Sequence, residues 1–215
     1  MSTGGEQNMN SILSIDGPVY HFLSRAVELI LLNILFLLCC LPIVTIGASL
    51  TAMFSITLKM VRGEEGGIIS GFWLAFKKNF KQSTLVWGFL SLFGMILALN
   101  YFFLQFYTGD FSTLILMSLV MFSMIFCMYL VLIFPYIARY KCTIKQACVN
   151  VLKLGIANLY PTLLIIAITL GPTILMFYSP YVFVIKLYLD IFIGFSLITY
   201  ISSFLIRNMF EKYEG

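Results

Sequence analysis

The fold is decided by one stretch, Leu38-Cys39-Cys40-Leu41-Pro42-Ile43-Val44-Thr45-Ile46-Gly47-Ala48-Ser49, which lies inside an apolar run from about Val27 to Met60. As one straight helix that run would be about 50 Å long, whereas the hydrocarbon core of a bilayer is only about 30 Å thick. Pro42 has no N–H and clashes with the carbonyl of Leu38. Gly47 tolerates backbone angles that are closed to its β-branched neighbours. The sequence therefore predicts a membrane helix that is broken at Pro42–Gly47.

The composition is that of a membrane protein. The 215 residues are 61% hydrophobic and 10% charged, whereas soluble domains are about 25% charged. The mean hydropathy is +1.01. We expect a single membrane-embedded helical domain over residues 1–215, with a short polar segment at residues 1–20 and the lipid bilayer as its surroundings. The net charge of +4 is modest and gives no reason to expect nucleic acid as a partner.

The basic residues lie almost entirely between the apolar runs, and this distribution predicts the topology. We expect an all-α polytopic bundle of about six spans in a bacterial plasma membrane, with both termini in the cytoplasm. Residues 61–82 and 139–153 would be the cytoplasmic segments. If Pro42 only kinks one long helix, the bundle has five spans and an external N-terminus. The six expected spans are approximately 22–41, 43–60, 85–104, 111–138, 155–178 and 181–206.

The first cytoplasmic segment combines a hydrophilic turn with an amphipathic helix. Three phenylalanines recur at four-residue spacing and three lysines lie beside them. Such a helix either rests its rings on lipid or on the protein itself, or docks on a cytoplasmic partner. The candidate contact face comprises Arg62, Phe72, Phe76, Lys77, Lys78, Phe80 and Lys81.

Two further patterns predict helix packing and a helix start. Gly47, Thr51 and Ser55 recur every four residues, which gives the second span a face of small residues that lets another helix approach closely. In the second cytoplasmic segment, Thr143 is placed to cap a short amphipathic helix.

Ionisable residues inside spans are candidates for function, because each costs about 3 kcal/mol or more at mid-membrane. Lys186 and Asp190 are four residues apart and share one side of the last span. They form either a structural ion pair or part of a polar cavity for a cation, a proton or a substrate. Arg25 and Glu28 lie three apart near the start of the first span, where an ion pair accounts for both. These four residues are the candidate intramembrane polar site.

Counting residues excludes several kinds of chemistry. The chain has one histidine, His21, so a catalytic triad and a histidine metal cluster are both excluded. It has no phosphate-binding loop, no zinc-protease motif and no nucleophile elbow. A methionine stripe at residues 117–128 could bind a soft metal, but methionine also fills gaps in ordinary apolar packing. We expect a protein that is not an enzyme and holds no cofactor.

One part of the chain resembles a known family. The segment from Leu29 to about Gln82 is similar to the YesL family of bacterial membrane proteins, and beyond it the similarity rests on the number and length of the spans and on a weak block at Asn150 and Lys153. The resemblance is carried by Leu32-Asn33-Ile34, residues 38–49, Lys59-Met60-Val61-Arg62-Gly63-Glu64-Glu65-Gly66, Phe72, Phe76, Lys77, Asn79, Phe80 and Lys81.

The resemblance implies a multi-span membrane protein with no established activity and no catalytic residue to carry over. Members are often encoded beside carbohydrate ABC importers, which implies a role in sugar uptake or its regulation. We therefore favour a non-enzymatic accessory protein that acts with a carbohydrate ABC transporter or another membrane protein. A small independent transporter or channel that uses Asp190 is the alternative, and an ABC permease subunit ranks lower. The spans hold few polar groups with which to coordinate a sugar, which favours the accessory role.

Overall fold

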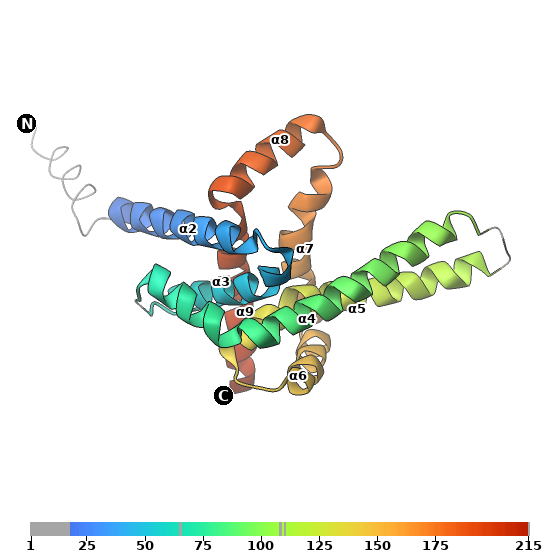
Figure 1. The fold of residues 1–215 in the computed structure, drawn as a ribbon, viewed down its shortest axis with the longest axis horizontal. Coiled ribbons are helices and arrows are strands. Elements are labelled where there is room, and N and C mark those ends of the chain that lie inside the picture. The colour runs from blue at the N-terminus through green and yellow to red at the C-terminus, as the bar shows by residue number, and fades with distance from the viewer. Residues whose placement is uncertain (1–17, 65, 108, 110, 215) are drawn as a thin grey trace, which may run out of the picture.

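The computed structural model describes residues 18–64, 66–107, 109 and 111–214, and this part of the chain is helical without strands (Figure 1). The prediction of an all-α membrane bundle is confirmed. The elements are α2 (Pro18–Cys40), the short 3-10 helix η1 (Ile43–Thr45), α3 (Ile46–Val61), α4 (Ile68–Leu104), α5 (Ser112–Arg139), α6 (Ile144–Ala157), α7 (Leu159–Leu175), α8 (Pro180–Leu189), the π-helix η2 (Asp190–Gly194) and α9 (Phe195–Glu214).

The break between the first two spans lies at Leu41-Pro42, as the proline predicts. The Thr45 hydroxyl is 2.5 Å from the carbonyl of Cys39 and 2.7 Å from that of Pro42, so it satisfies acceptors released where α2 ends. The alternative of one kinked helix is wrong, because α2 ends at Cys40 and the chain continues as a second candidate span, Ile43–Val61, formed by η1 and α3. Gly47 takes no part in the bend and lies within α3.

Helix α3 is the centre of the bundle and contacts α2, α4, α5 and α9. Its small residues allow this, as the sequence predicts. A Cβ added at Gly47 would lie 2.5 Å from the backbone oxygen of Ser83 on α4. Hydroxyl pairs join α3 to its neighbours: Thr51 with Ser83 and Thr57 with Ser203, each with oxygens 2.8 Å apart.

Helix α4 corrects the prediction for residues 61–82. The expected amphipathic helix and the third span form one continuous helix of 37 residues, about 55 Å long. The non-helical residues described between α3 and α4 are 62–64, 66 and 67. No proline interrupts residues 80–85, and Ser83 is buried against Thr51, which holds the middle of α4 on the bundle. Together with α5, the second half of α4 forms a long helical hairpin that extends away from the other helices (Figure 1).

The number of spans depends on how the helices in the region of the fifth expected span are grouped. It does not depend on the break between the first two spans. Helices α6 and α7 meet at 103°, and α7 has only 17 residues. The start of α6 is as predicted: Thr143 and Gln146 form a reciprocal capping box. The described helices give five spans, or six when the bent pair is counted as one.

Candidate functional site

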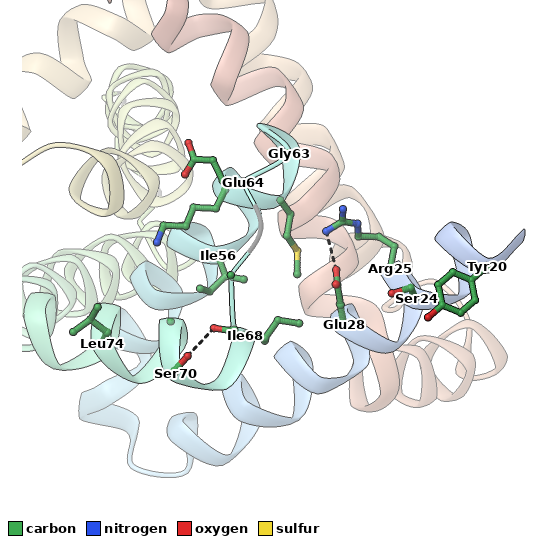
Figure 2. A pocket seen from close by; sticks show the side chains of 15 residues that line it. Tyr20, Ser24, Arg25, Glu28, Ile56, Gly63, Glu64, Ile68, Ser70 and Leu74 are labelled. Atoms are coloured by element: carbon green, nitrogen blue, oxygen red, sulfur yellow. Dashed lines mark hydrogen bonds and ion pairs between the residues drawn. The ribbon is translucent and has the colours of Figure 1, made fainter. Parts of the chain in front are cut away.

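A pocket of about 740 Å³ lies between the first half of α2, the end of α3 and the start of α4 (Figure 2). Its lining residues come from two stretches of the chain, 20–28 and 56–74. The ionisable and hydroxyl side chains that line it are Tyr20, Ser24, Arg25, Glu28, Lys59, Glu64 and Ser70.

The α2 wall of the pocket carries an ion pair. The Arg25 Nη1 atom lies 2.7 Å from Glu28 Oε2, and these side chains are 40% and 33% exposed. This is the geometry that the three-residue spacing predicts. Both side chains are partly exposed, so the pair lies at the rim of the bundle rather than deep in it.

The opposite wall is shaped by the way α3 ends. Gly63 has a φ of 70°, which favours glycine. The N–H of Gly63 donates to Met60 and the N–H of Glu64 donates to Lys59, at 3.1 and 3.0 Å, which is the hydrogen-bond pattern of a Schellman motif. The Arg62 side chain does not line the pocket and pairs with Glu64, with Nε and Oε1 3.1 Å apart. The turn therefore fixes the backbone of Lys59 and Glu64 beside the pocket.

Lys186 and Asp190 form an ion pair at a second place, where α8 passes into the π-helix η2. Their side chains are only 13% and 16% exposed. Gly194, one turn further on, leaves space beside this pair, because an added Cβ would displace the Asp190 carboxylate. The four predicted polar residues thus belong to two separate constellations.

Asn33 on α2 binds the backbone of the π-helix. This role of Asn33 was not predicted from the sequence. Its side chain is fully buried, and its amide nitrogen donates to the carbonyls of Asp190 and Ile191, both at 2.9 Å. Its oxygen accepts from the N–H of Ser196 at 3.1 Å. A π-helix leaves backbone groups without their usual α-helical partners, and one side chain here satisfies three of them. A lone amide in an apolar run was the available signal.

The residues of the predicted contact face do not all lie on one surface in the structure. Phe72 is fully buried in the core and therefore does not contribute to a contact face, and its ring stacks on Phe76 at 6.2 Å. Arg62 belongs to the turn after α3. The remaining five residues, Phe76, Lys77, Lys78, Phe80 and Lys81, line a surface groove of about 360 Å³ on the first half of α4.

Part of the chain matches a family model to which no activity is assigned. Residues 29–101 match one family model, described as a protein of unknown function, DUF624. The matched segment includes Asn33, the break at Pro42, Gly47 and the Schellman turn. It covers the segment that resembles the YesL family, which the match does not name. No curated protein and no solved structure matches the chain. The apolar helices show that the chain is an integral membrane protein. The match to DUF624 assigns no reaction to it.

Proposed function

We propose that the protein is a non-enzymatic accessory or regulatory component of a carbohydrate uptake system in the bacterial plasma membrane. Its α3–α4 turn and both termini would face the cytoplasm. The basic residues around residues 59–81 and 139–145 support this orientation. The association with sugar uptake rests on the resemblance of residues 29–82 to the YesL family.

The observation that carries the proposal is the groove on the first half of α4. Lys77, Lys78 and Lys81 are exposed, and no ion pair joins them to another residue in the described part of the chain. Phe76 and Phe80 lie between them, with ring centroids 5.4 Å apart. Aromatic rings flanked by cations suit a partner that offers acidic residues around an apolar side chain.

The groove is also rigidly joined to the membrane part. The same helix that carries these lysines continues through the bundle to Leu104. Its middle is fixed by the Thr51–Ser83 hydroxyl pair and by the close approach of Gly47. A partner bound to the groove would therefore act on the spanning helices as well, which suits a regulatory component.

Neutralising the groove should separate the protein from its partner. We expect the triple change Lys77→Gln, Lys78→Gln and Lys81→Gln to abolish co-purification with the sugar transporter from mildly solubilised membranes, because charge complementarity across the contact is removed. The matched control removes the same charge elsewhere, with Lys141→Gln, Lys145→Gln and Lys212→Gln. Equal losses in both triple variants, or an unchanged complex in the first, would contradict the proposal.

A second candidate is a small independent transporter or channel, favoured by the π-helix at Asp190. The last span changes helix type at a half-buried ion pair, and transporters place binding sites at interrupted helices. In proteoliposomes, this function expects sugar or cation flux that falls strongly in Asp190→Asn and persists in the exposed control Glu211→Gln. Flux that is equal in wild type and Asp190→Asn would rule out a role for this site.

A further inference from the structure

We propose that the pocket between α2, α3 and α4 binds the phosphate-bearing head group of a membrane phospholipid. The pocket lies where α2 begins and where α3 turns into α4, so it is at the end of the bundle that carries Lys59 and Arg62. This position corresponds to the head-group level of the leaflet on that side.

Lys59 provides the charge for the phosphate. Arg25 is paired with Glu28, and Glu64 with Arg62. Lys59 lines the pocket and forms no ion pair with any residue that the structure describes, so its ammonium group has three donors available. The carbonyl of Lys59 accepts the N–H of Glu64, so the turn fixes its backbone beside the pocket, and its flexible four-carbon stem lets the ammonium group adjust to a ligand. A cation that lines a partly enclosed pocket favours an anionic group.

The backbone at the start of α4 adds to this attraction. The helix begins after Gly67, which provides no side-chain cap, and both Gly66 and Gly67 line the pocket. The first N–H groups of a helix have no partner within it and carry its positive end. A Cβ added at Gly66 would meet nothing within 4 Å, so the space beside this backbone is open.

The remaining walls favour a lipid over a soluble phosphate ester. Ile56, Met60, Ile68 and Leu74 line the pocket beside the charged groups, and Leu74 is 69% exposed. The Tyr20 phenol, 51% exposed, stands at the rim, where tyrosine is common at membrane interfaces. A volume of about 740 Å³ is far larger than a phosphate group requires and includes room for the start of an acyl chain.

The test measures binding of a short-chain phospholipid to the full-length protein in a non-ionic detergent. Dihexanoyl phosphatidylglycerol is titrated and its Kd is followed by thermophoresis. We expect Lys59→Gln to weaken binding about tenfold, the usual effect of losing a charge-assisted hydrogen bond. Lys59→Arg should restore affinity, because the positive charge is kept. The control Lys77→Gln, on the separate groove of α4, should bind as wild type does.

Two further probes identify the source of the phosphate. Glycerophosphoglycerol contains the phosphodiester head group alone, and dihexanoylglycerol contains the acyl chains alone; each should bind much more weakly than the phospholipid. Glycerophosphoglycerol binding as tightly as the lipid would overturn the proposal in favour of a soluble phosphate ester. Equal binding of dihexanoylglycerol, or an unchanged Kd in Lys59→Gln, would overturn the phosphate site itself.

Discussion

Replacing Asn33 by leucine is expected to lower the free energy of unfolding by about 3 kcal/mol, because three backbone groups of the π-helix region lose their partner. These groups are the carbonyls of Asp190 and Ile191 and the N–H of Ser196. Leucine has a similar volume, so the change removes hydrogen bonds without opening a large cavity. Unfolding of the detergent-solubilised protein by sodium dodecyl sulfate, followed by tryptophan fluorescence, measures the loss.

Asn100→Leu is the matched control for Asn33→Leu. Asn100 is exposed, and its amide donates only to the carbonyl of Ile96 in its own helix, at 2.8 Å. That carbonyl keeps its helical hydrogen bond after the change, so stability should change by less than about 0.5 kcal/mol. If both variants lose the same stability, the asparagine bridge to the π-helix is not what stabilises this part of the bundle.

Gly47→Ala is expected to cost about 3 kcal/mol, the upper end of the usual range for overpacking. The added Cβ would lie 2.5 Å from the backbone oxygen of Ser83 and 2.6 Å from Cβ of Trp87. Neither atom is the far end of a flexible side chain, so α3 and α4 must move apart. The same unfolding titration measures the loss, and a shift in the Trp87 emission would report the changed helix contact.

Gly88→Ala provides the control in the same region. Gly88 lies one residue after Trp87 in α4, and an added Cβ there meets nothing within 4 Å. Alanine favours a helix over glycine by about 1 kcal/mol, so this variant should be as stable as wild type or slightly more so. A Gly47→Ala protein as stable as Gly88→Ala would show that α3 and α4 do not depend on their close approach.

The parts of the fold that were predictable depend on single residues with strong local effects. Pro42 cannot continue a helix, and the break occurs there. Thr143 followed by Gln146 three residues later is a capping box, and α6 begins after it. The small residues at Gly47 and Thr51 face other helices. Each of these signals is complete within a few neighbouring residues.

The parts that were missed depend on distant partners. The π-helix at Asp190–Gly194 has no local signature, since its backbone groups are satisfied by Asn33 more than 150 residues earlier. The amphipathic pattern ending at Lys81 suggested that a helix stops, but buried Ser83 anchors α4 to α3 and the helix continues. Phe72 was placed in the candidate contact face because its spacing matches that of Phe76, with packing on the protein itself left open. Its packing against α2 and α3 shows that it is buried.

The residues that line the pocket between α2, α3 and α4 were not predicted to form one site. Arg25 and Glu28 were assigned to an intramembrane site with Lys186 and Asp190, whereas they line a pocket with Lys59 and the turn after α3. Spacing along one helix predicted both ion pairs. It carries no information about which helix faces which, so the sequence could not show that α2 closes over the α3–α4 turn.

The continuity of α4 has a mechanical consequence. Ser83 and Trp87, which meet Gly47, lie near the middle of the helix, with about 22 Å of rod on one side and about 25 Å on the other. The helix thus contacts α3 near its midpoint and would pivot there. A tilt of about 5° that moves the lysine end would displace the far tip, at Leu104, by about 2 Å in the opposite direction. A movement at the lysine end of α4 would in this way reach its far end without any helix unfolding.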